Sequence, residues 1–252
     1  MFLNVFNDNY IKNEEEFAME KINATNQIDV ESLNRNQMVE IIEGINHGLT
    51  INQILIYAKP IFNWSQMIEI REGIERGLSM KQIMIYTNPE FRWGQMCEIR
   101  LGLLHELPIE SVMIYTNPEF GIEEMKNIRL GLEEGLDVDR VKVYAKPEFD
   151  LIQMREIREG FLCGLTIDQV RIYANPELNI SQMIVIENAL RDGLDPELIK
   201  EFANPEYDHK QLMVIFAAIM NGIDIDEIHK FANSDFSDIE MKKILEDIIM
   251  KG

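Results

Sequence analysis

The chain has 252 residues, of which 46% are hydrophobic and 27% are charged, a composition typical of folded rather than disordered proteins. Acidic residues outnumber basic ones by 44 to 24, giving a formal charge of −20. This charge argues against direct nucleic-acid binding and against attachment to an anionic membrane surface. It favours protein partners with a basic surface, although it also serves solubility alone.

The first 27 residues lie outside the pattern that fills the rest of the chain. Asn13 to Phe17 open a short amphipathic segment, so we expect residues 1–27 to form an N-terminal cap or a partner-binding arm. We find neither a signal-peptide pattern nor a run of about 18 apolar residues. Cys97 and Cys163 form no disulfide framework. We therefore expect a cytoplasmic protein, in the producing cell or in a host cell.

From residue 28 onward the sequence repeats every 29 residues, with repeats beginning near residues 28, 57, 86, 115, 144, 173, 202 and 231. Position 1 of a repeat is an aromatic residue, usually followed by a tripeptide that ends in proline. These aromatic residues are Tyr57, Tyr86, Tyr115, Tyr144, Tyr173, Phe202 and Phe231. A fixed period of this length indicates a repeat architecture.

Each repeat predicts two helices. A capping residue at position 7, such as Asn63, precedes Gln or Glu three residues later, as in a capping box that begins a long helix. Glycine at position 21, such as Gly77, predicts the end of that helix. A second capping residue at position 23, such as Ser79, begins a short helix that ends before the next proline. We expect the helices to span about 13 and about 9 residues.

The apolar positions predict how the repeats pack. An aromatic residue at position 6 and methionine at position 11, such as Phe62 and Met67, form a hydrophobic staple and belong to the core. Position 17 is glycine or alanine, for which we expect close approach of a neighbouring helix. The predicted fold is all-α: a right-handed α-solenoid of about eight helix–turn–helix repeats, forming one domain over residues 28–252.

The repeat, best matched at Tyr144 to Leu165, resembles short helical repeats in uncharacterised proteins of low-GC bacteria and their phages. The resemblance covers residues 28–252. It implies an α-solenoid with a binding role in a bacterial or phage protein. It brings no ligand and no enzymatic activity with it.

Two columns suggest a binding surface in the half of the array that holds Trp64, Trp93, Arg71 and Arg100. Position 15 carries Arg71, Arg100, Arg129 and Arg158, and position 8 carries Trp64 and Trp93. The arginines either satisfy carbonyls and neighbouring carboxylates or form a ladder that grips external anions. The tryptophans either pack between repeats or anchor a partner. A third column, at position 5, is acidic: Glu90, Glu119, Glu148, Glu177, Glu206 and Asp235.

Signals for catalysis are absent from the sequence. The four histidines are scattered, and no metal-binding, phosphate-binding or nucleophile motif is present. We expect a non-enzymatic interaction module or inhibitor without metal or cofactor. One alternative is an acidic nucleic-acid mimic that inhibits a nucleic-acid-binding protein through the acidic column. Another is a small-anion or nucleotide binder that uses the arginines.

Overall fold

A computed structural model describes residues 16–24 and 27–251. All regular structure within these residues is helical, which confirms the all-α class. Residues 16–24 are helical and bury Ala18 and Ile22. The remainder of the expected N-terminal cap or arm, residues 1–15 and 25–26, lies outside the described residues.

Long and short helices alternate along the chain. The long helices are α2 (Arg35–Asn46), α4 (Trp64–Glu75), α6 (Trp93–Leu104), α8 (Ile122–Glu133), α10 (Leu151–Leu162), α12 (Ile180–Arg191), α14 (His209–Met220) and α16 (Asp238–Lys251). The short helices are α3 (Ile51–Tyr57), α5 (Met80–Tyr86), α7 (Ile109–Val112), α9 (Val138–Tyr144), α11 (Ile167–Tyr173), α13 (Pro196–Phe202) and α15 (Ile225–Ile228). A 3₁₀ helix, η1 (Val30–Ser32), precedes α2.

The helices are slightly shorter than expected. Most long helices have 12 residues and most short ones have seven, while α7 and α15 have only four. The starts agree with the predicted capping residues, as Asn63 and Ser79 show, so the difference lies at the C-terminal ends. The tyrosine or phenylalanine at position 1 closes most of the short helices.

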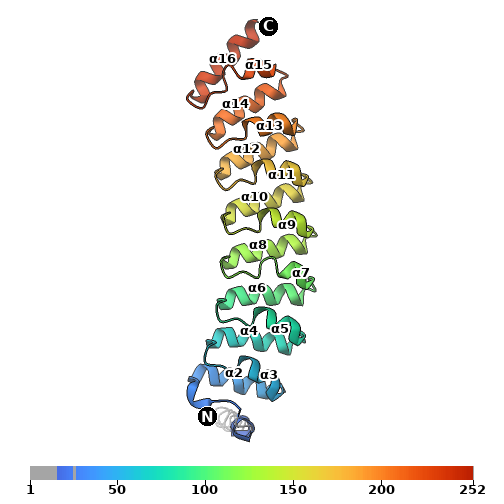
Figure 1. The fold of residues 1–252 in the computed structure, drawn as a ribbon, viewed down its shortest axis with the longest axis vertical. Coiled ribbons are helices and arrows are strands. Elements are labelled where there is room, and N and C mark those ends of the chain that lie inside the picture. Colours follow the sequence, from blue (N-terminus) through green and yellow to red (C-terminus); the bar gives the residue numbers. More distant parts are fainter. Residues whose placement is uncertain (1–15, 25–26, 252) are drawn as a thin grey trace, which may run out of the picture. The chain divides into compact units, whose positions relative to one another are not determined.

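The chain divides into two compact units, residues 1–129 and 130–252. In the N-terminal unit α2 packs against α4 and α4 against α6. In the C-terminal unit α10, α12, α14 and α16 pack in the same successive way. The short helices contact the long helices beside them, for example α5 with α6 and α13 with α14 (Figure 1).

A buried glutamine at position 10 both caps its own helix and holds the next repeat. Gln66 Oε1 accepts a hydrogen bond from the Asn63 backbone N–H at 2.8 Å. Gln66 Nε2 donates to the carbonyls of Pro89 and Phe91, at 3.1 and 2.7 Å. Equivalent bonds to the next repeat are made by Gln37, Gln95, Gln153, Gln182 and Gln211. The capping box is confirmed, and its glutamine has a second function that the sequence analysis did not predict.

The long helices end as predicted. Gly77 has a φ of 86°, and the Leu78 N–H donates to the Gly73 carbonyl at 3.0 Å, as in a Schellman motif. Glu106 occupies the same position with a φ of 62° although it is not glycine. In most repeats the residue at position 6 and the methionine at position 11 are buried, as predicted for the staple.

The small residue at position 17 makes room for a tyrosine of the neighbouring short helix, so the expected close approach of a neighbouring helix is present and is made by a side chain. A Cβ atom on Gly73 would lie 1.9 Å from the Tyr86 hydroxyl oxygen, which donates to the Glu69 carbonyl at 3.2 Å. Where the aromatic residue is Phe202 or Phe231, position 17 is alanine, Ala189 or Ala218. The chain therefore gains a methyl group where it loses a hydroxyl.

This size match predicts a compensating pair of substitutions. Gly73→Ala should lower the free energy of unfolding by about 1–3 kcal/mol, because the new methyl group overlaps the Tyr86 hydroxyl. Adding Tyr86→Phe should restore most of that loss, which urea unfolding followed by circular dichroism would measure. A Gly73→Ala variant as stable as the wild type would contradict this account.

Candidate functional site

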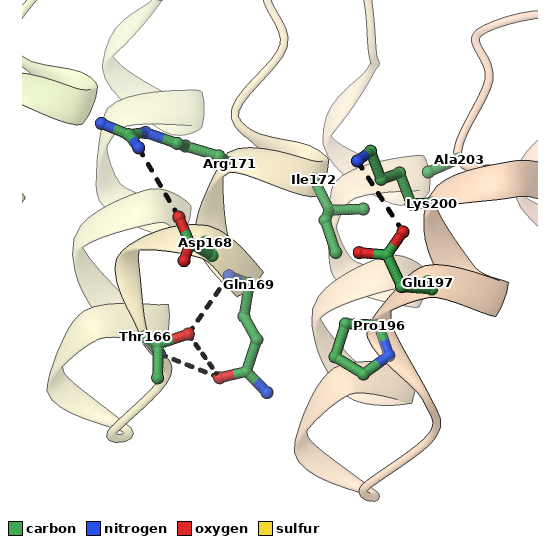
Figure 2. A pocket seen from close by; sticks show the side chains of 9 residues that line it. All are labelled: Thr166, Asp168, Gln169, Arg171, Ile172, Pro196, Glu197, Lys200 and Ala203. Carbon is green, nitrogen blue, oxygen red and sulfur yellow. Dashed lines mark hydrogen bonds and ion pairs between the residues drawn. The ribbon is translucent and has the colours of Figure 1, made fainter.

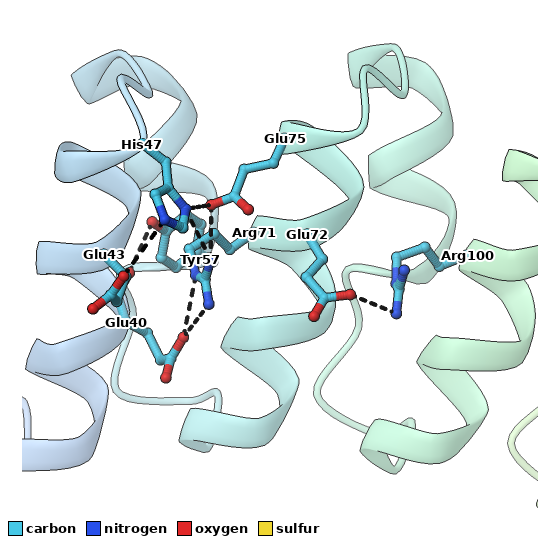
Figure 3. Close-up of polar contacts among 8 residues, drawn as sticks. All are labelled: Glu40, Glu43, His47, Tyr57, Arg71, Glu72, Glu75 and Arg100. Atoms are coloured by element: carbon cyan, nitrogen blue, oxygen red, sulfur yellow. Dashed lines mark hydrogen bonds and ion pairs between the residues drawn. The ribbon is translucent and has the colours of Figure 1, made fainter.

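Arginine–glutamate pairs join successive long helices in the N-terminal unit. Arg71 Nη2 on α4 lies 3.0 Å from Glu40 Oε2 on α2, and its Nη1 lies 2.8 Å from Glu75 Oε1 (Figure 3). Arg100 Nε donates to Glu69 Oε2 at 2.9 Å. The partners lie 31 residues apart, at position 13 of one repeat and position 15 of the next. We call this series of facing residues the inter-helix ladder.

The next two predicted arginines differ from each other. Arg129 Nε donates to Glu98 Oε2 at 2.8 Å, which continues the ladder. Arg158 has Asn127, not an acid, 31 residues before it in the sequence. Its Nη1 instead pairs with Glu134 Oε2 at 3.2 Å. The arginines are therefore engaged by neighbouring carboxylates, and this geometry favours their structural interpretation over an open anion-binding ladder.

Burial and pairing act in opposite directions on the ladder carboxylates. Burial raises the pKa of Glu40 and of Glu69 above the usual value, although the facing arginines lower it. Burial would also raise the pKa of Glu75, but hydrogen bonds from Arg71 and His47 hold that pKa below its usual value. His47 Nδ1 lies 2.9 Å from Glu75 Oε1 (Figure 3). These contacts tie α2 to α4.

The ladder changes character in the C-terminal unit. Glu156 on α10 faces Glu187 on α12, so two carboxyl groups occupy a step that holds an arginine–glutamate pair elsewhere. Val185 and Phe216 line one cavity between α12 and α14. Val214 and Leu245 line another between α14 and α16. Sequence analysis missed the ladder, whose signal is the recurrence of matched residue types 31 positions apart.

The Glu156–Glu187 pair shares a partly desolvated site. Glu187 is 4% exposed, and its Oε1 has no hydrogen-bond partner. The nearby cation is Arg191, whose Nη1 lies 3.6 Å from that oxygen. Burial, together with hydrogen bonding to Glu187 and its charge, raises the pKa of Glu156 to about 8. One proton is therefore held between the two carboxyl groups at neutral pH.

This pair predicts a pH dependence of stability. The native state keeps a proton that the unfolded chain releases near pH 4.5, so the free energy of unfolding should fall as pH rises toward 8 and level off above it. Because Glu156 is partly exposed, we expect a loss on the order of 1 kcal/mol between about pH 6 and 8.

Urea unfolding at several pH values would measure this loss. In Glu187→Gln the neutral amide removes the like charge while the burial of Glu156 remains, so the fall should become smaller. The same pH dependence in the wild type and in Glu187→Gln would show that the pair does not hold the proton.

The two predicted tryptophans are exposed to solvent. Trp64 and Trp93 are the first residues of α4 and α6, helices that pack against each other, and their exposed fractions are 46% and 55%. Trp64 borders a groove of about 240 Å³ together with Asn36, Val39 and Glu40. Packing between repeats therefore covers only about half of each indole.

The acidic column is also exposed. At most of its members the backbone N–H donates to the asparagine at position 3, as from Glu90 to Asn88 Oδ1 at 3.1 Å. The carboxylates are directed outward or pair locally, as Glu148 does with Lys146 at 3.5 Å. All six predicted members are exposed: Glu90, Glu119, Glu148, Glu177, Glu206 and Asp235.

The cavity between α11 and α13 is an unpromising site for chemistry. It measures about 640 Å³ and lies between α11 and α13 (Figure 2). Its charged side chains pair within their own helices, Asp168 with Arg171 at 3.6 Å and Glu197 with Lys200 at 3.9 Å. These ion pairs are exposed to solvent, where such pairs contribute little. Within the described part of the chain, no group of three potential ligands is arranged to hold a metal ion.

Comparisons with protein-family models, curated proteins and solved structures found no match to this chain. Among the helices of residues 16–24 and 27–251, none has the length and apolarity needed to cross a membrane.

Proposed function

We propose that the chain is a non-catalytic protein-interaction module, without metal or cofactor. It binds a partner through the solvent-exposed side of its long helices, the side that carries Trp64 and Trp93. In this proposal residues 28–252 form a single right-handed α-solenoid of about eight repeats. The recurring glutamine bonds and buried staples support equivalent stacking within each unit. A cytoplasmic location and the absence of direct nucleic-acid or membrane binding belong to the same proposal.

The exposure of Trp64 and Trp93 is the observation that carries this proposal. Two half-exposed indoles on neighbouring helices α4 and α6 place large apolar area in water. Tryptophan is enriched among the residues that dominate binding energy at protein interfaces. The Arg71 and Arg100 pairs, which are largely shielded from solvent, fix α4 and α6 against their neighbours. The indoles therefore project from a rigid support, which lowers the entropic cost of binding.

The charge of the chain indicates the chemistry of the partner. A formal charge of −20 attracts proteins with a basic surface and speeds their association. Glu43 and Glu72 lie beside the arginine pairs on α2 and α4 (Figure 3). We therefore propose a partner with apolar side chains for the indoles and basic residues around them.

The exposed acidic column supports a second candidate. In this alternative the position-5 carboxylates imitate phosphates and occupy the basic groove of a nucleic-acid-binding protein, which would be inhibited. Such binding would weaken steeply with salt. The third candidate, an anion or nucleotide binder, has less support because carboxylates already engage Arg71, Arg100, Arg129 and Arg158.

Replacing both tryptophans tests the first candidate. Trp64→Ala with Trp93→Ala should preserve the melting temperature and weaken partner binding at least about tenfold, because each exposed indole acts at the interface. The partner would be captured by tagged wild type from nuclease-treated native extract and its affinity then measured with purified proteins. Met84→Ala with Met113→Ala, also exposed in the N-terminal unit, is the matched control.

Retention of wild-type affinity by the tryptophan variant would contradict the proposal. If affinity is instead lost in Glu90→Gln with Glu119→Gln and falls steeply with salt, the acidic alternative takes its place.

A further inference from the structure

The outward side of α12 and α14 carries an uncovered apolar groove. Val185, Phe216 and Met220 line a cavity of about 240 Å³ that Met213 also borders. Met213 and Met220 are 56% and 57% exposed. Methionine side chains are flexible and adapt to varied apolar partners. The groove lies in the C-terminal unit, so it is separate from the tryptophan surface.

The Glu156–Glu187 pair lies one ladder step away from this groove. Val185 and Glu187 are two residues apart on α12, and they occupy ladder positions that face α14 and α10 respectively. At the corresponding steps of the N-terminal unit, an arginine neutralises the glutamate. Here a second glutamate stands in place of the facing arginine, and the buried Glu187 Oε1 accepts no hydrogen bond.

The surroundings of the pair do not supply a full counter-charge. Glu159 on α10 adds negative charge, and the Tyr173 hydroxyl of α11 is buried without a hydrogen-bond partner. Arg191 on α12 reaches Glu187 only at 3.6 Å, and its side chain is 46% exposed. A cationic group brought from outside would therefore meet an unbalanced, partly desolvated pair of carboxyl groups.

We propose that α10, α12 and α14 form a docking surface for an amphipathic basic helix of a partner protein. Its apolar side chains occupy the groove beside Met213 and Met220, and its lysine or arginine pairs with Glu156 and Glu187. An amphipathic helix carries apolar and basic side chains close together, so it can reach both the groove and the carboxyl pair. This inference does not depend on the tryptophan surface.

The lysines beside the neighbouring cavity indicate how the bound helix is oriented. Lys210 and Lys242 border the neighbouring cavity between α14 and α16, where Lys242 pairs with Asp238 at 2.8 Å. These cations disfavour a second basic group there. The basic end of the bound helix therefore lies over α10 and α12, and its apolar part lies over α14.

A designed peptide tests this surface with the full chain. The probe is a fluorescein-labelled leucine–lysine amphipathic helix of about 14 residues, about four turns, and its counterpart replaces lysine with glutamate. Fluorescence anisotropy should show binding of the lysine peptide and at least about tenfold weaker binding of the glutamate peptide. Met213→Ser with Met220→Ser should weaken binding of the lysine peptide about tenfold. Met84→Ser with Met113→Ser is the matched control and should have no effect.

The pH dependence separates the proposed site from general attraction to an acidic protein. A lysine bound to the pair displaces the shared proton, so wild-type affinity should rise up to about tenfold between about pH 6.5 and 8.5. Glu187→Gln should reduce this rise, because it removes the like charge beside Glu156. Trp64→Ala with Trp93→Ala should leave peptide binding unchanged, which distinguishes the two surfaces.

Three results would overturn the inference. Equal binding by the wild type and Met213→Ser with Met220→Ser would show attraction by net charge alone. Equal binding of both peptides would remove the role of the carboxyl pair. The same pH dependence in wild type and Glu187→Gln would place the basic group elsewhere.

Discussion

The buried glutamine at position 10 is the interaction on which the rest of the structure depends. The Gln66 carboxamide accepts a hydrogen bond from the Asn63 backbone N–H at the start of its own helix. It also donates hydrogen bonds to the carbonyls of Pro89 and Phe91 in the next repeat. Since buried backbone groups must be hydrogen-bonded, this side chain links helix initiation to stacking. Glu124 and Glu240 replace glutamine in two repeats, and a carboxylate has no N–H to donate. Recurrent bonds of this kind set a constant offset between facing residues.

Because the offset between facing residues is constant, the same two positions of each repeat meet in the inter-helix ladder. The interior columns remain nearly uniform, with Met67, Met96, Met154 and Met183 fully buried at equivalent places. The ladder, by contrast, changes from arginine–glutamate pairs to a carboxyl pair and then to apolar pairs. One backbone arrangement thus supports surfaces of different chemistry in the two units. This separation of a constant core from a varied exterior suits a protein whose function is recognition.

The sequence predicted what is local and missed what depends on the offset between repeats. Capping boxes, staples and glycine helix ends each lie within a few residues, so their patterns were sufficient. The partner of position 17 could have been found, because Ala189 and Ala218 accompany Phe202 and Phe231. The ladder was missed because helical periodicity does not state which residue faces the next helix, and its signal is the recurrence of matched residue types 31 positions apart. The sequence pattern also does not state which side chains the next helix covers, so the place of Trp64 at position 8 could not show that it is exposed.

Site-specific photo-crosslinking in the producing cell tests the central claim most directly. A photoreactive phenylalanine derivative would replace Trp64 in one variant and Glu90, in the acidic column, in another. The account predicts that the partner crosslinks to the variant at position 64 and not to the variant at position 90, because it proposes that Trp64 and Trp93 on α4 and α6 contact the partner. Crosslinking from position 90 alone would contradict it and would place recognition on the acidic column.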